Sequence, residues 1–128
     1  MKKKFIVSAP FLFIFAALFF VFAPEASADK TAVALVGPDS AAAGTEVTIV
    51  VNVTHKGNSR LHHTNWVTVK ADGVEIARWE FKASSRPESA NFSREVKLTV
   101  EKTMEITAQG NCNLHGSRGP AVLKINVN

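Results

Sequence analysis

The sequence has 128 residues, a formal net charge of +4 and a hydrophobic content of 46%. No basic patch with interleaved aromatic residues is present, which argues against nucleic acid as a partner. The sequence holds a single cysteine, so no disulfide can form within the chain.

The first 28 residues have the pattern of a secretory signal peptide. Lysines occupy positions 2–4, an apolar run covers 11–23, and Ala26-Ser27-Ala28 is a small-x-small cleavage site. The alternative is a membrane anchor, but the run is shorter than the ~20 apolar residues that a span requires. We therefore predict cleavage after Ala28. The mature chain, 29–128, is expected to be one domain in a bacterial periplasm, without membrane contact.

The mature region predicts an all-β fold. Apolar residues alternate with polar ones at period two, and no stretch keeps the 3.6-residue period of a helix. The predicted strands are 31–36, 46–54, 64–71, 74–82, 93–100, 103–109 and 120–127, and Asp72-Gly73 is a hairpin signal. This spacing is typical of an immunoglobulin-like, seven-stranded antiparallel β-sandwich. Trp66 and Trp79 are then expected to be core or edge aromatics.

The histidines and the cysteine fall in two predicted loops. His55, His62 and His63 lie between the second and third strands, and Cys112 and His115 lie between the sixth and seventh. If successive strands run up and down, both loops and the start of the first strand lie at one end of the sandwich. A thiolate with imidazoles suits Fe(II), Cu or Zn. The alternatives are unrelated surface histidines beside a buried structural cysteine.

The stretch Cys112-Asn113-Leu114-His115-Gly116 is similar, letter for letter, to the closing motif of the superoxide reductase family, also called desulfoferrodoxins or neelaredoxins. Upstream, His55 at a strand end and His62 four residues before Trp66 also resemble the family pattern. The resemblance implies an immunoglobulin-like sandwich that holds one non-haem iron. Cys112 would be the axial thiolate, with His55, His62 and His115 as equatorial ligands. It also implies reduction of superoxide to hydrogen peroxide.

The chain departs from the family pattern at two places. Lys56 replaces the proline that follows the first loop histidine, and the loop is one residue longer. The family's Glu-Lys-His segment before the first strand is matched by Asp29-Lys30-Thr31, so a threonine stands where the fourth equatorial histidine is expected. The open alternatives are a site with three imidazoles, a contribution from His63, or a water or the α-amino group of Asp29 as ligand.

Two lysines are candidates for the catalytic cation that the resemblance implies. By position Lys30 corresponds to the family's lysine, which attracts superoxide and assists protonation of the product. Lys56, beside His55, is the substitute, and an ordinary solvated charge is the alternative for each. An ammonium near an open metal position suits an anionic substrate.

Three functions are compatible with these residues. The first is an exported superoxide reductase that takes electrons from an external donor protein, because the chain has no Cys-x-x-Cys of its own. The second is a non-catalytic metal-binding or electron-transfer module that carries iron, copper or zinc. The third is a sandwich that binds a partner protein and has lost its metal. The sequence does not indicate the donor or the oligomeric state.

Overall fold

The computed structural model describes residues 29–128, so the predicted signal peptide lies outside the described residues. The structure has eight strands and no helix in this part of the chain: β1 (Ala32–Val36), β2 (Ser40–Ala41), β3 (Thr45–Thr54), β4 (Thr64–Ala71), β5 (Val74–Glu80), β6 (Phe92–Val100), β7 (Met104–Cys112) and β8 (Ala121–Val127). Correspondingly, none of the described residues forms a helix long and apolar enough to cross a membrane.

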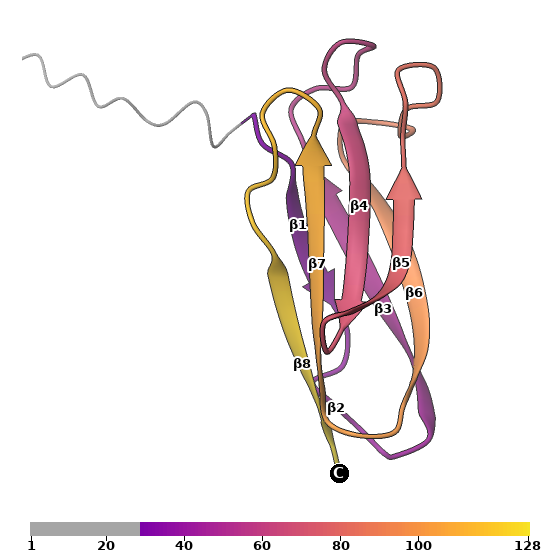
Figure 1. The fold of residues 1–128 in the computed structure, drawn as a ribbon. Coiled ribbons are helices and arrows are strands. Elements are labelled where there is room, and N and C mark those ends of the chain that lie inside the picture. The colour runs from indigo at the N-terminus through magenta and orange to yellow at the C-terminus, as the bar shows by residue number, and fades with distance from the viewer. Residues whose placement is uncertain (1–28) are drawn as a thin grey trace, which may run out of the picture.

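The strands form two sheets, which confirms the predicted all-β sandwich. One sheet has the order β1-β3-β6 and the other β2-β8-β7-β4-β5. The two layers face each other in Figure 1. The prediction of seven strands was one short, because β2 consists of two residues paired in parallel with the end of β8. A strand of that length shows no alternation in sequence.

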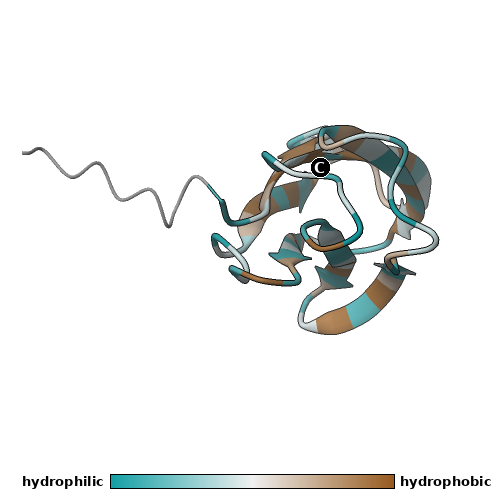
Figure 2. Ribbon diagram, turned by 90° about the horizontal axis from the view of Figure 1, so that it is seen from above, coloured by the Kyte–Doolittle hydropathy of each residue, from teal (hydrophilic) through white to brown (hydrophobic). Residues whose placement is uncertain are grey.

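Alternation along the strands builds the core. Val47, Ile49, Val51 and Val53 on β3 are buried, while none of the three residues between them is. They meet Val67 and Val69 of β4, Ile106 and Ala108 of β7, and Ile125 of β8. The bands of hydrophobic and hydrophilic residues along the strands are visible in Figure 2. Trp79 is partly buried against this core, as expected, and the half-buried Trp66 has the Arg78 guanidinium over its ring.

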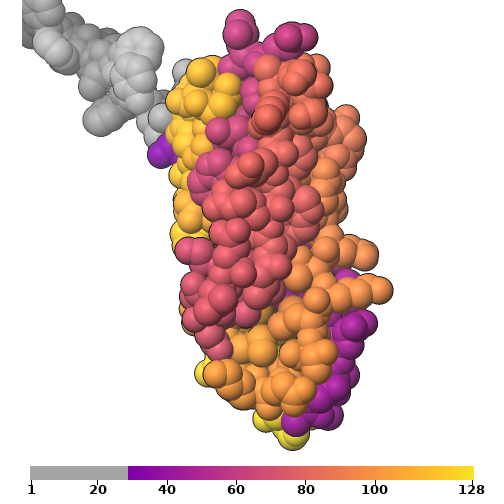
Figure 3. Space-filling view, turned by 45° about the vertical axis from the view of Figure 1, so that its right-hand side comes forward, coloured from indigo at the N-terminus to yellow at the C-terminus, as the bar shows by residue number. Residues whose placement is uncertain are grey.

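Strand direction brings three segments together at one end of the sandwich, as predicted. These are the chain before β1, the loop between β3 and β4, and the loop between β7 and β8 (Figure 1). In Figure 3 the last two lie at the same end, in magenta and in yellow-orange. Asp72 and Gly73, both with positive φ, form the hairpin turn between β4 and β5 at the opposite end.

Candidate metal centre

His55 directly follows β3 and is held on three sides. Its backbone N–H donates to Asn91 Oδ1 at 3.1 Å, which ties it to the segment before β6. Its ring Nδ1 lies 2.7 Å from the carbonyl oxygen of Gly57, and its ring Nε2 lies 2.9 Å from the carbonyl oxygen of Asp29. The side chain is 6% exposed. The imidazole is therefore fixed before any ligand arrives.

His62 is placed by a tight turn and by the absence of a side chain at Gly57. Ser59 and His62 exchange backbone hydrogen bonds of 2.8 and 3.2 Å, which closes the turn. A Cβ at position 57 would lie 2.5 Å from His62 Nδ1, so only glycine leaves room for this ring. The ring of His62 packs edge-on against the ring of His55, with centroids 4.7 Å apart.

Cys112 is the last residue of β7, three residues beyond the predicted end of that strand. A turn follows in which Cys112 and Gly116 exchange backbone hydrogen bonds of 2.9 and 3.0 Å. Gly116 has φ of 84°, a conformation that favours glycine. The turn brings His115 Nδ1 to 3.7 Å from Cys112 Sγ. The i and i+3 side chains therefore converge, as the motif predicts.

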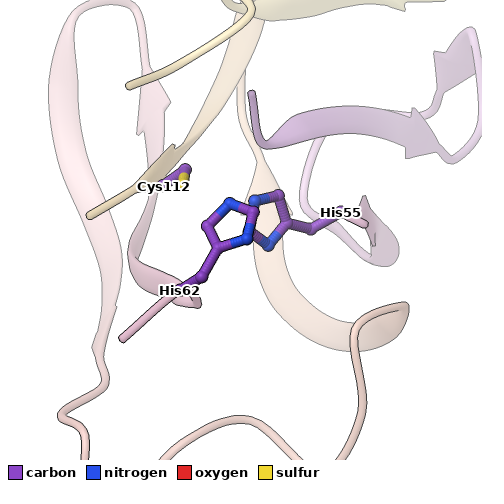
Figure 4. A group of neighbouring side chains, drawn as sticks. All are labelled: His55, His62 and Cys112. Atoms are coloured by element: carbon purple, nitrogen blue, oxygen red, sulfur yellow. The ribbon is translucent and has the colours of Figure 1, made fainter. Parts of the chain in front are cut away.

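These side chains form one cluster. Donor atoms of His55, His62 and Cys112 all lie within 4.8 Å of one another, and Figure 4 shows the three side chains converging. His115 extends the cluster, because its Nδ1 lies 3.2 Å from His62 Nε2. Cys112 is 1% exposed and is not in a disulfide. The structure thus brings together all four residues that the sequence proposed as metal ligands, and their binding of a metal stays a prediction.

His63 does not join the cluster. Its ring is buried, with Nδ1 3.0 Å from the carbonyl oxygen of Ser59. Its backbone N–H donates to Asn113 Oδ1, and Asn113 also donates to the carbonyl oxygen of Leu61. Asn113 thereby joins the two ligand loops, a role that sequence reasoning missed although the residue lies inside the motif.

Thr31 occupies an interior position beside the cluster. It is fully buried, and its hydroxyl lies 2.9 Å from the hydroxyl of Thr64. A Cβ at Gly110 would come within 2.7 Å of the Thr31 methyl group, so Thr31 is closely packed on that side. The residue in place of the expected fourth histidine is therefore engaged in packing and hydrogen bonding.

Cations surround an open pocket next to His55. The pocket has a volume of about 340 Å³ and is lined by Lys30, Ala32, Thr54, His55, Lys56, Asn91 and Arg118. Both predicted lysines line it, and Arg118 adds a third cation that sequence reasoning missed. The Arg118 backbone is fixed by its N–H, which donates to the Thr31 carbonyl at 2.9 Å. The arrangement gives one flank of the cluster a positive field.

Burial lowers the pKa of His62, and the neighbouring His55 and His115 lower it further, while Asp29 acts in the opposite direction. A lowered pKa keeps the imidazole neutral near pH 7. The neutral form is the one that binds a metal ion.

The donor set fits a transition-metal ion. Two donors each ~2.1 Å from one ion lie about 3.0 to 3.4 Å apart at right or tetrahedral angles, and His62 Nε2 and His115 Nδ1 are 3.2 Å apart. Both ring nitrogens of His55 lie at hydrogen-bond distance from carbonyl oxygens. A neutral imidazole has only one N–H, so it donates to one of these oxygens and keeps a lone pair on the other ring nitrogen for a metal ion.

The fold and the cluster define the class of protein: a two-sheet β-sandwich with a candidate metal centre of histidines and one cysteine. The chain belongs to the desulfoferrodoxin family, because the family model described as Desulfoferrodoxin matches residues 25–117, most of its length. The predicted family resemblance is confirmed. The sequence matches no curated protein.

Solved structures support the fold. A superoxide reductase (neelaredoxin) from Ignicoccus hospitalis is 23% identical, with a TM-score of 0.64, over 77% of this chain and 83% of that one. A Thermotoga maritima protein provisionally described as a superoxide reductase is also 23% identical, with a TM-score of 0.60, over 76% of this chain and 86% of that one. The CARDB domain of a Pyrococcus furiosus protein, in complex with di-metal ions, is 16% identical, with a TM-score of 0.58, over 78% of this chain and 94% of that one. The sandwich thus occurs in other proteins too, and the fold alone does not identify the function.

Proposed function

We propose that this protein is an exported mononuclear non-haem iron protein that reduces superoxide to hydrogen peroxide with electrons from an external donor. The observation that carries the proposal is the convergence of His55, His62, Cys112 and His115 at one end of the sandwich, in a chain of the desulfoferrodoxin family. Export to a bacterial periplasm is part of the proposal and is supported by the signal-peptide pattern of residues 1–28.

Iron held by these residues would supply the single electron that, with two protons, converts superoxide to hydrogen peroxide. Cys112 would serve as thiolate ligand, since a thiolate donates electron density to the metal. Its 1% exposure keeps it out of reach of bulk oxidants. The Nδ1–H of His55 would donate to the Gly57 carbonyl, which leaves Nε2 as the donor that faces the ion.

The cationic pocket is the proposed approach for superoxide. Lys30, Lys56 and Arg118 line the space beside His55 and attract an anion to the cluster. Lys30 and Lys56 are also the candidates for assisting protonation of the product. Replacing Lys56 or Arg118 by Ala should lower the bimolecular rate with superoxide and weaken its dependence on salt. Metal affinity should stay unchanged, because neither side chain is among the proposed ligands.

The external electron donor would bind at the end of the sandwich that carries the cluster. Leu61 and Leu114 are 80% and 61% exposed, and each is adjacent to a proposed ligand. Apolar side chains beside a cationic pocket suit a transient contact with an acidic redox protein.

Pulse radiolysis of the iron-loaded mature protein tests the proposal. We expect the iron(II) protein to develop a thiolate-to-iron(III) absorption band as it reduces superoxide, at a rate that depends on superoxide concentration. The Cys112→Ser variant, matched in size, should lose the band. An iron-loaded protein that is inert toward superoxide would contradict the enzyme function.

The second candidate function is a non-catalytic metal-binding or electron-transfer module that carries iron, copper or zinc. The observation that favours it is Thr31, which is buried against Thr64 in the place of the fourth histidine. Metal analysis of protein from its native compartment, with visible and electron-spin spectra, separates the two. Bound zinc, or a blue copper band, would support the module.

A further inference from the structure

The proposed donor set lacks one nitrogen, and among the described residues neither Thr31 nor His63 supplies it. Thr31 is buried and hydrogen-bonded to Thr64, and His63 is turned to the carbonyl of Ser59. A threonine hydroxyl is also a poor match for a site of imidazoles and a thiolate. The missing donor must therefore come from elsewhere, or the site has fewer donors than the family pattern.

The backbone of Asp29 lies at the cluster. Its carbonyl oxygen is 2.9 Å from Nε2 of His55, the nitrogen that faces the cluster once Nδ1 donates to Gly57. Two donors that bind one ion at right angles lie about 3.0 Å apart, so Nε2 and this carbonyl oxygen are spaced to bind the same ion. Asp29 is also close enough to His62 to act on its pKa. The first described residue therefore lies beside two of the proposed ligands.

Covalent geometry extends this contact to the nitrogen of the same residue. Within one residue the backbone nitrogen and carbonyl oxygen are separated by roughly 3 Å, so both can bind one ion in a five-membered ring. An amide nitrogen cannot bind in this way, because its lone pair is delocalised into the peptide bond. A free α-amino group can. The difference depends only on whether residue 28 is attached.

The structure thus points to a metal ligand that export creates. We propose that cleavage after Ala28 frees the α-amino group of Asp29, which then completes the metal site together with the Asp29 carbonyl oxygen. This inference rests on the proposed function. Its consequence is that the precursor binds metal more weakly than the mature protein, so the site matures only after the leader is removed.

The experiment compares three N-termini on the same domain, 29–128, which contains every strand and all core residues of the described fold. One form begins at Asp29, a second begins at Ala28, and a third begins at Asp29 with an acetylated amine. Affinity for Co(II) and for Fe(II) is measured anaerobically by competition with a chromophoric chelator. His62→Ala in the form that begins at Asp29 reports whether the cluster binds metal at all.

We expect the form with the free Asp29 amine to bind about 10- to 100-fold more tightly than the two others. Iron-loaded protein labelled with ¹⁵N-aspartate should show ¹⁵N coupling in double-resonance spectra only for that form. Equal affinity of the three forms, with a weak His62→Ala variant, would overturn this inference and leave the proposed function intact. If no form binds more tightly than the His62→Ala variant, the metal site and the inference both fail.

Discussion

Gly57 is the residue at which a single methyl group should disable the metal centre. An alanine Cβ at this position would lie 2.5 Å from His62 Nδ1 and 3.0 Å from two ring carbons, where ordinary contacts begin at 3.4 Å. The ring of His62 would therefore have to retreat by roughly 1 Å, and metal ligands tolerate shifts of about 0.2 Å. We expect Gly57→Ala to bind Co(II) about 10- to 100-fold more weakly, which corresponds to about 1.4 to 2.8 kcal/mol.

The assay is an anaerobic Co(II) titration followed by the thiolate-to-metal and ligand-field absorption bands, with thermal unfolding of the metal-free protein in parallel. Gly37→Ala is the matched control. A Cβ at Gly37 would meet side-chain atoms of Leu123 and Ile49 at 3.1 and 3.3 Å, beyond the end of β1 that is remote from the histidines. This control should change stability but not affinity. Wild-type affinity in Gly57→Ala, or an equal loss in Gly37→Ala, would refute the reasoning.

Three further changes test how the described structure is held together. Asn113→Ala removes two hydrogen bonds to the backbone of the β3–β4 loop and should cost about 1 to 3 kcal/mol of stability and weaken metal binding, whereas Asn113→Asp keeps one acceptor and should lose less. The pKa of Glu88 is lowered to about 2, chiefly by the Arg94 hydrogen bond. The small stabilising contribution of the ionised carboxylate is therefore present above the ordinary pKa of 4.5 and lost as pH falls toward 2. The unfolding free energies of Glu88→Gln and wild type, measured in urea, should converge over that range. Thr31→Val leaves the buried Thr64 hydroxyl without its partner and should cost about 1 to 3 kcal/mol of unfolding free energy. The double variant Thr31→Val/Thr64→Val should cost less than the sum of the two single changes. Neither Thr31→Val nor the double variant should alter metal affinity.

The fold was predictable because the sequence signals for its strands and turns are local. Alternation within each strand marks the buried residues, as for Val47 to Val53 on β3, and positive φ at Asp72 and Gly73 follows the sequence signal for a hairpin. The grouping of His55, His62, Cys112 and His115 followed from strand direction alone, because the ends of antiparallel strands alternate between the two ends of a sandwich.

The parts that were not predictable depend on contacts between distant residues. The sequence placed Asp29 at the same end of the sandwich as the histidines, but backbone atoms carry no sequence signal, so the contact of its carbonyl oxygen with His55, 26 residues away, was not predicted. The choice between His62 and His63 had one weak signal, the spacing of four residues from His62 to Trp66 that resembles the family pattern. Which of the two histidines faces the cluster also depends on Asn113, 50 residues beyond His63, which holds the backbone of that residue.

Removal of the metal should leave the sandwich folded. The segments that carry the proposed ligands are joined by backbone hydrogen bonds, and none of these bonds uses an atom proposed to bind the metal. Thr31 receives a hydrogen bond from Arg118 and donates to the Gly116 carbonyl, and Asn113 donates to the His63 carbonyl. The core lies along the strands and is formed by aliphatic residues. We therefore expect metal-free protein to keep its far-ultraviolet β spectrum. Added metal should raise the unfolding free energy only by mass action, about 2.7 kcal/mol at a hundredfold excess over Kd. Loss of the β spectrum on chelation would show instead that the metal, and not these backbone hydrogen bonds, holds this end of the domain together.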